Sequence, residues 1–349
     1  MKQIDTIKDL CDHLQTAVEI EWSVIPPYLC ALWSLHEDAN ELAAAILKDV
    51  LMEEMLHLTL VANVLIALGR RPLLVPPDAK LPVYPGFLPH SDDAFQVSLL
   101  PFSEDAVKTF RRIEQPAAAG APPQPDRYAT IGQFYEALIE AVNRLGKDPA
   151  VWKGKGDPQV TGEYYYGGGG AAFRVDGLAK AVDALELITW EGEGLPGSVT
   201  DGDQTLGEPE ELAHFFRFDE LLKRRQYTLE DNPGTPTGPP ILLDYAAVRP
   251  MVPNPRTSTY PTANGLRAMS EACDMTYSRL LQQLDNAFGG NPARMIVAVQ
   301  TMKQLGTQAV ALMNVPFKDG YTAGPAFEWR PPPPATKAYA SSASSAAAR

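Results

Sequence analysis

The stretch LKDVLMEEMLHLTLVANVLIALG at residues 47–69 constrains the fold most, because two carboxylates and a histidine interrupt one of the most apolar segments of the chain. Helical steps of three and four residues place Glu54 and His57 on its apolar stripe, one turn apart, and leave Glu53 outside the stripe. A buried carboxylate and imidazole without partners would be costly. Together they offer two ligands to a transition metal. The alternative is a core histidine that only hydrogen-bonds Glu54.

The Glu-x-x-His pattern occurs a second time. The chain has five histidines, and only His57 and His214 stand three residues after a glutamate, which is Glu54 in one case and Glu211 in the other. Both pairs lie on segments with helical periodicity. In di-metal carboxylate bundles, two helices supply one Glu each and two supply Glu-x-x-His. The pattern therefore predicts a four-helix bundle that holds a pair of metal ions.

The helix predicted at 5–37 offers a further carboxylate, Glu21, on the same face as Tyr28. The two side chains are two turns apart, so the phenol of Tyr28 can reach a metal-bound carboxylate and orient it. We therefore predict Tyr28 as the catalytic residue. In the alternative, Tyr28 fills the core and bonds a carbonyl freed by Pro26 and Pro27, which should kink the helix. Glu21 would then pair with a basic residue elsewhere.

Composition limits the classes of function. The chain has 349 residues, a formal net charge of -13 and no long cluster of Lys and Arg, so nucleic acid and anionic membranes are not expected partners. Its three cysteines form no disulfide framework, which fits a reducing compartment. The N-terminus lacks the apolar run of a signal peptide. We expect a cytoplasmic protein whose partner is a small-molecule substrate, and the sequence leaves a homodimer open.

The predicted fold class is all-α: a four-helix bundle with irregular insertions and a C-terminal helical pair. Periodicity and capping signals predict helices at 5–37, 40–68, 104–115, 130–146, 177–194, 208–227, 262–288 and 292–313. The bundle should occupy 1–230, with insertions at about 72–128, where a β-hairpin is expected, and at about 147–177. Residues 231–330 form a Pro-rich wrap and the helical pair, and 331–349 are a disordered tail.

Several motifs together resemble a known family, and the resemblance runs from about residue 6 to 330: EIEWSVIPPYLCALWSL, EEMLHLTLVANVLIALG, YATIGQFYEALIEAV, GEG, ELAHFFRF and AGPAFEW. They are similar to the ferritin-like domain of the iminophenyl-pyruvate dimer synthase and chromopyrrolate synthase group. The resemblance implies a four-helix di-metal core with iron as the usual metal. Carboxylates and two imidazoles suit iron or manganese, so manganese is the alternative. In characterised members it implies oxidative coupling of amino-acid-derived imines. This chain lacks the large extra region of those synthases, which leaves its substrate open.

The ligand from the helix at 130–146 is ambiguous. The family resemblance favours Glu140. Local periodicity argues against it, because Glu136 and Glu140 lie opposite the apolar stripe of this helix. Glu114, in RRIEQP, is a further alternative.

The ligand that accompanies His214 is also open. Glu193, near the end of the helix at 177–194, follows Leu185 and Thr189 at helical spacing. With His214 it would make an interrupted Glu-x-x-His. Glu211 makes the uninterrupted pattern. The predicted dinuclear centre is therefore held by Glu21, Glu54, His57, Glu140, Glu193 or Glu211, and His214.

The expected function is that of a diiron oxidoreductase or oxygenase. It would use O2 or peroxide on a small organic substrate, such as an amino-acid-derived one, in bacterial secondary metabolism. The alternative is a non-enzymatic role, either as a ferritin-like metal-binding protein or as a helical binding module without metal.

Overall fold

The computed structural model describes residues 3–166, 169–202, 204 and 209–331, and within them the regular structure is helical. Eight α-helices follow in order: α1 Ile7–Ser34, α2 Glu41–Ala67, α3 Glu104–Ile113, α4 Ile131–Leu145, α5 Leu178–Glu193, α6 His214–Lys223, α7 Leu266–Phe288 and α8 Arg294–Met313. The predicted all-α class is confirmed. The expected β-hairpin is reduced to one isolated antiparallel bridge, between Gly86 and Val97. Apart from Pro331, the predicted tail lies outside the described residues.

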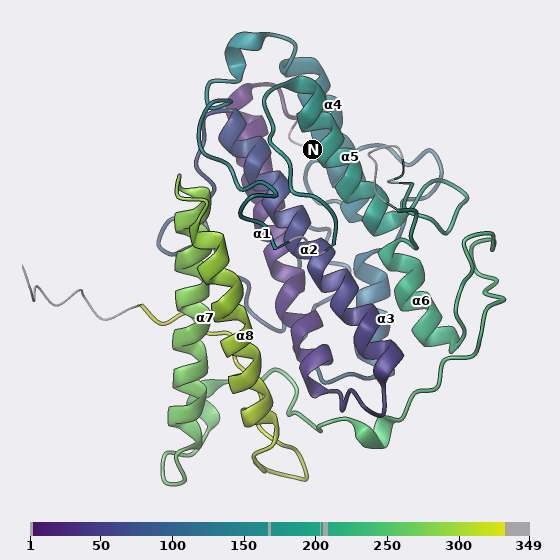
Figure 1. The fold of residues 1–349 in the computed structure, drawn as a ribbon, viewed down its shortest axis with the longest axis vertical. Helices are drawn as coiled ribbons and strands as arrows, with labels where there is room; N and C mark the ends of the chain where they lie inside the picture. Colours follow the sequence, from purple (N-terminus) through teal and green to yellow (C-terminus); the bar gives the residue numbers. More distant parts are fainter. Residues whose placement is uncertain (1–2, 167–168, 203, 205–208, 332–349) are drawn as a thin grey trace, which may run out of the picture.

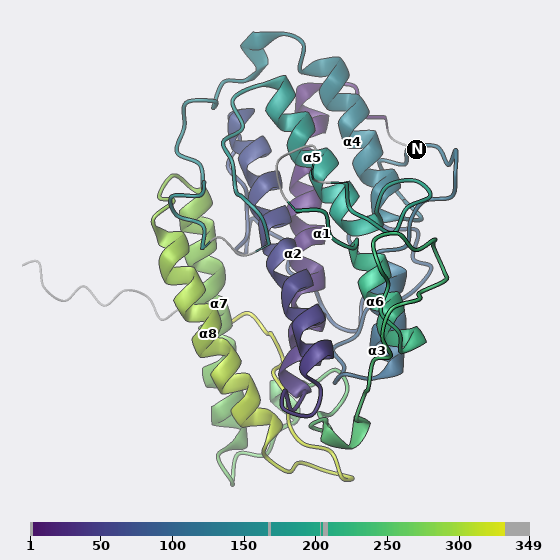
Figure 2. The same ribbon diagram turned by 45° about the vertical axis from the view of Figure 1, so that its right-hand side comes forward.

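The helices form three layers. Helices α1 and α2 pack against each other in the middle layer. The pair α4 and α5 covers one side of them, and α7 and α8 lie along the other (Figures 1 and 2). Side chains of the middle layer are therefore buried on both sides, and the core of the molecule runs along α1 and α2.

The layer of α3 to α6 is interrupted at mid-height. Helices α4 and α5 pack together in its upper half, whereas α3 and α6 pack together in its lower half (Figures 1 and 2). The segment 114–130 separates α3 from α4, and the segment 194–213 separates α5 from α6. The middle layer thus faces two shorter helix pairs instead of one pair of continuous helices.

Helix α1 continues through two prolines. Pro26 and Pro27 lie inside it, and Pro27 cannot donate the bond that the carbonyl of Ser23 would accept in a regular helix. The phenol of Tyr84 donates to this carbonyl instead, at 2.7 Å. A side chain from the segment that follows α2 thereby satisfies a buried acceptor at this point.

Helix α2 is long and apolar enough to cross a membrane by length and composition, but 83% of its most apolar window is buried inside the protein. This burial is typical of a core helix in a soluble bundle. Its burial by α1 on one side and by α5 and α7 on others explains why its polar residues at 53, 54 and 57 need partners within the protein.

Two regions contain details that periodicity did not specify. Of the helix predicted at 208–227, the described residues 209–227 are helical from His214 to Lys223, and Leu212 pairs with Thr200 in an isolated bridge. The short helix predicted inside the insertion at 72–128 is present as α3, and it packs against α6 in the bundle. Both differences bear on which carboxylates reach the centre of the molecule.

Candidate metal centre

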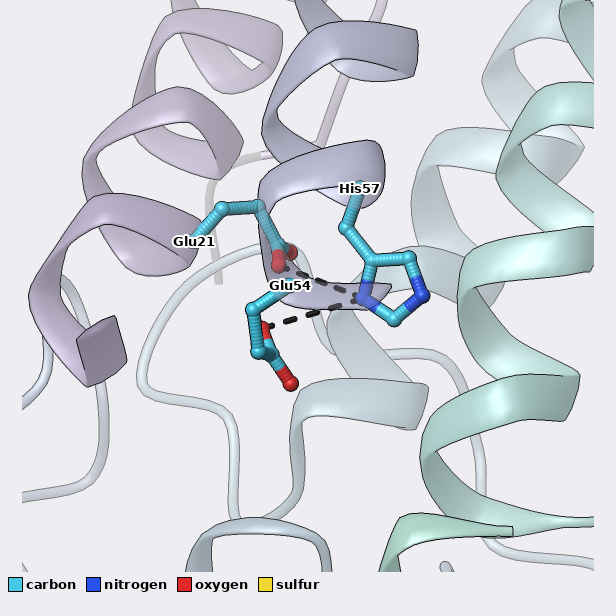
Figure 3. A group of neighbouring side chains, drawn as sticks. All are labelled: Glu21, Glu54 and His57. Carbon is cyan, nitrogen blue, oxygen red and sulfur yellow. Dashed lines mark ion pairs between the residues drawn. The ribbon is translucent and has the colours of Figure 1, made fainter. Parts of the chain in front are cut away.

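Two groups of potential ligands meet in the core, and they share one carboxylate. The first comprises Glu21 from α1 with Glu54 and His57 from α2 (Figure 3). The second comprises Glu54, Glu114 at the C-terminal end of α3, and His214, the first residue of α6. In each group the ligand atoms lie within 4.8 Å of one another. All five side chains are buried, so each polar atom depends on its neighbours.

Both imidazoles direct Nδ1 towards the carboxylates. His57 Nδ1 lies 3.7 Å from Glu21 Oε2 and 3.7 Å from Glu54 Oε2, as the dashed lines in Figure 3 mark. His214 Nδ1 lies 3.0 Å from Glu54 Oε1 and 3.8 Å from Glu114 Oε2, yet it makes no well-oriented hydrogen bond. A buried imidazole nitrogen that faces two carboxylates without a hydrogen-bond partner has the surroundings expected of a metal ligand.

The outer nitrogen of each imidazole contacts another carboxylate. His57 Nε2 lies 2.5 Å from Glu191 Oε2, and His214 Nε2 lies 2.7 Å from Glu53 Oε2. When Nε2 carries the proton and donates it to a carboxylate, the lone pair of Nδ1 remains available on the inner side. Metal-bound histidines commonly have such a partner, which fixes the ring and its tautomer.

In each ligand group, the carboxylate other than Glu54 accepts a hydrogen bond from a phenol. The hydroxyl of Tyr28, on α1, donates to Glu114 Oε1, and the hydroxyl of Tyr135, on α4, donates to Glu21 Oε1. The two halves of the site therefore repeat one scheme around Glu54: an imidazole held by a carboxylate, and a carboxylate held by a tyrosine. The two imidazole rings lie 5.4 Å apart, inclined by 27°.

Burial and crowding set the charges of the site. Burial raises the pKa of Glu21 and of Glu191 to about 7. Burial acts in the same direction on Glu54, but the imidazoles of His214 and His57 beside it overcome the effect of burial and lower the pKa of Glu54 to about 2. The cluster therefore gathers more carboxylates than the two imidazoles can neutralise, which favours a bound cation.

The donor set fits hard or borderline metal ions. Carboxylate oxygens and imidazole nitrogens suit iron, manganese or zinc, whereas soft sites use thiolates. The three cysteines of the chain are buried and belong to neither ligand group. The residues of this structure therefore fit metal ions: Glu21, Glu54 and His57 could hold one, and Glu54, Glu114 and His214 could hold another, with Glu54 common to both groups.

Arg217, in the first turns of α6, extends the network towards the surface. Its guanidinium lies 3.8 Å from Glu53 Oε1 and 3.6 Å from Asp49, and it also pairs with Glu211. Arg217 therefore compensates the carboxylate that holds His214, as well as two carboxylates at the surface.

Five of the residues predicted for the site come together in the core: Glu21, Glu54, His57, His214 and Tyr28. Glu140 does not join them. It lies on the exposed face of α4, because Phe134, Leu138 and Val142 turn the apolar stripe of this helix inward. Local periodicity was the better guide at this position.

The two candidates for the partner of His214 also lie outside both ligand groups. Glu211 precedes α6 in an extended segment, so the three-residue spacing does not put it on the same helical face as His214. Its side chain is 47% exposed and pairs with Arg217. Glu193 accepts hydrogen bonds from the backbone amides of Gly132 and Ala117, at 2.8 and 3.1 Å. Burial raises its pKa to about 7.

Sequence reasoning missed Glu53, Glu191 and Tyr135, and kept Glu114 only as an alternative. A signal for Glu191 was present, because the buried positions Ala184, Leu187 and Ile188 lead to it in helical steps. No local signal identifies Glu53, which lies beside the apolar stripe of α2. Its role follows from the position of α6, whose first residue brings His214 against it.

Comparisons with known proteins agree with this architecture. The family model described as Ferritin-like matches residues 14–223. A dichlorochromopyrrolate synthase from Lentzea aerocolonigenes is 27% identical over an alignment of 398 residues, which covers 93% of this chain and 36% of that protein. The chain thus spans about a third of the length of this relative.

A solved structure is also similar in fold. The crystal structure of a ferritin like protein from Caulobacter vibrioides has a TM-score of 0.66 and 21% sequence identity, over 94% of this chain and 100% of that chain. At this identity the likeness concerns the fold alone.

Proposed function

This chain belongs to the ferritin-like family, and we propose that its bundle holds a dinuclear iron centre with which it oxidises a small organic substrate. Dioxygen or peroxide is the proposed oxidant, and an amino-acid-derived molecule of bacterial secondary metabolism is the proposed substrate. The similarity to a dichlorochromopyrrolate synthase supports an enzyme of oxidative secondary metabolism.

One observation carries the proposal: two groups, each with an imidazole and two carboxylates, share Glu54 in the core. A carboxylate common to both groups can bring two metal ions together, which is the arrangement of di-metal carboxylate bundles. The iron pair would supply the redox chemistry with the oxidant, for which the side chains have no means of their own.

The chain's own residues hold the site in place. Glu191 and Glu53 accept the Nε2 protons of His57 and His214, so that both rings keep Nδ1 on the inner side. Tyr28 donates a hydrogen bond to Glu114, and Tyr135 donates one to Glu21. Each bond fixes the direction of the other oxygen of that carboxylate. The surrounding apolar side chains exclude bulk water and so strengthen each of these contacts.

A surface groove near the site is lined by side chains that complement an amino-acid-derived ligand. It measures about 810 Å³ and is lined by Trp190, Phe215 and Phe216 among other residues. Arg111 and Lys223 share one acid, Asp219, at 2.6 and 3.1 Å, which leaves positive charge on that wall. Acidic side chains lie along α4 on another wall. An aromatic body with an amino and a carboxylate group would be complementary to this lining.

Metal analysis tests the proposal most directly. Protein produced in iron-rich medium is expected to carry about two iron ions per chain, and Glu54→Ala is expected to lose both, because both groups contain Glu54. The matched control, Glu140→Ala, removes a carboxylate from the exposed face of α4 and should retain the metal. Wild type without bound metal, or with metal that persists in Glu54→Ala, would refute the dinuclear site.

Oxidative activity is tested separately. Iron-loaded protein is expected to consume dioxygen faster when aromatic amino acids or their imines are added, whereas zinc-loaded protein should not respond. If none of these substrates changes the rate of dioxygen consumption by iron-loaded protein, the proposed enzymatic activity is refuted and only a metal-binding role remains.

A further inference from the structure

The space next to the ligands is too small for an organic substrate. A cavity of about 20 Å³ adjoins Glu21, Glu54, His57 and Glu114, and its remaining walls include Ile20, Val24, Ile113, Ile131 and Ile188. A cavity of this size holds about one water molecule, whereas ligand pockets usually measure about 300–1,000 Å³. The cavity can therefore admit a molecule of the size of dioxygen but not an amino acid.

The large groove reaches this cavity at one junction. Gly132, Thr189 and Glu193 line both the cavity of about 20 Å³ and the groove of about 810 Å³. The junction lies where the layer of α3 to α6 is interrupted, at the first turn of α4 and the last turn of α5. The helix interruptions thus create both the groove and its closest approach to the ligands.

The carboxylate of Glu193 occupies this junction. It bridges the start of α4 and the segment that follows α3, because it accepts hydrogen bonds from the amides of Gly132 and Ala117. It lies so close to Gly132 that a Cβ atom added there would be 2.2 Å from Oε1. A helix N-terminus favours a carboxylate in this place.

We propose that Glu193 is a gate residue between the groove and the metal cavity, and that the position of its carboxylate sets the size of the molecule that reaches the metals. The inference rests on the proposed function for its biological meaning. With the carboxylate on Gly132 and Ala117, only the small oxidant fits beside the ligands. When the side chain rotates away, the cavity and the groove become continuous and an organic substrate can approach.

The gate differs from a metal ligand in its contacts. Glu193 accepts hydrogen bonds from backbone amides of two segments, with the Thr130 side chain also close to it, and it belongs to neither ligand group. It lies at the C-terminal end of α5, directly before Gly194, whose φ is +84°. Its side chain can therefore leave the junction by rotation about its own bonds, without displacing the helices that hold the ligands.

Thiol labelling of metal-free protein tests the gate without reference to metal. Val24 lines the cavity and not the groove, and it is buried, so Val24→Cys places a reporter thiol behind the gate. Two reagents of different size are used, methyl methanethiosulfonate and N-phenylmaleimide, with the adducts counted by mass spectrometry. The three native cysteines are buried, and labelling of Cys30 serves as the internal monitor of unfolding.

In the Val24→Cys background, Glu193→Ala is expected to accelerate labelling by N-phenylmaleimide at least about tenfold, and labelling by the smaller reagent by less. Gly132→Ala should act in the same direction, because the added methyl group displaces the carboxylate. Glu140→Ala, which changes a carboxylate on the outer part of the same groove, should leave both rates unchanged. Ile20→Cys provides a second reporter on the cavity wall if Val24→Cys does not fold.

Equal rates in Glu193→Ala and its parent, with Cys30 unlabelled in both, would overturn the gate. The result is independent of the metal analysis. A chain that binds iron but shows no effect of Glu193 would lose the gate alone, and a chain that shows the effect but binds no metal would lose the proposed function alone.

Discussion

The two tyrosines of the site offer a paired test of its organisation. Tyr28 donates to Glu114 in one half, and Tyr135 donates to Glu21 in the other. Both phenols are fully buried, and each bonds a carboxylate of a different ligand group. The changes Tyr28→Phe and Tyr135→Phe keep the ring and remove only the hydroxyl, so they probe the hydrogen bond with little change in packing.

The expected magnitude follows from the charge of the acceptor. A hydrogen bond to a charged group contributes about 1.5–3 kcal/mol, and loss of a partner that supports a metal ligand typically lowers metal affinity about 10–100-fold. That fold-change corresponds to about 1.4–2.7 kcal/mol, so the two estimates agree. Each variant should therefore fill with metal at saturation, bind it more weakly than wild type, and oxidise more slowly when the ferrous protein meets dioxygen.

Competition with a metal chelator measures the affinity, and stopped-flow absorbance measures the oxidation. The matched control is Tyr84→Phe, which removes another buried phenol whose hydroxyl donates to a backbone carbonyl, that of Ser23, and not to a carboxylate of either ligand group. It should lower the free energy of unfolding by about 1–3 kcal/mol and leave metal affinity unchanged. If Tyr84→Phe weakens metal binding as much as Tyr28→Phe and Tyr135→Phe do, the phenols act through general stability and the reasoning is refuted.

Three further changes have defined outcomes. Glu53→Gln should weaken metal binding about tenfold in the same chelator competition, because His214 loses its carboxylate partner; an unchanged affinity would remove Glu53 from the site. Removal of metal by a chelator should lower the melting temperature of wild type, measured by calorimetry, because the ion no longer stabilises the folded state, and should not change that of Glu54→Ala. Burial raises the pKa of Asp274, on α7, to about 6. The folded chain therefore binds a proton at Asp274 more tightly than the unfolded chain does. The contribution of Asp274 to the free energy of unfolding is complete below about pH 4 and is lost as the pH rises towards 6. Urea unfolding measures the difference in the free energy of unfolding between wild type and Asp274→Asn, and this difference should change by about 2 kcal/mol across this pH window. A difference that stays constant with pH would contradict the raised pKa of Asp274.

The sequence alone determined the features that depend on one helix. Helical spacing put Glu54 and His57 on one face of α2, and Glu21 and Tyr28 on one face of α1, and all four are buried at the centre of the structure. The same reasoning opposed Glu140, which is exposed. Periodicity succeeds here because a residue's direction within a continuous helix is fixed by its position in the chain.

Tertiary structure decided which residues complete the two ligand groups. Glu114 follows the last residue of α3, Glu191 lies in the last turn of α5, and His214 begins α6. These positions are near helix ends, where periodicity stops and the direction of the chain depends on what packs against it. Glu53 joins the site only because α6 begins opposite it. Helix packing therefore selected these residues, since the local sequence specifies the face of a helix but not where two interrupted helices meet.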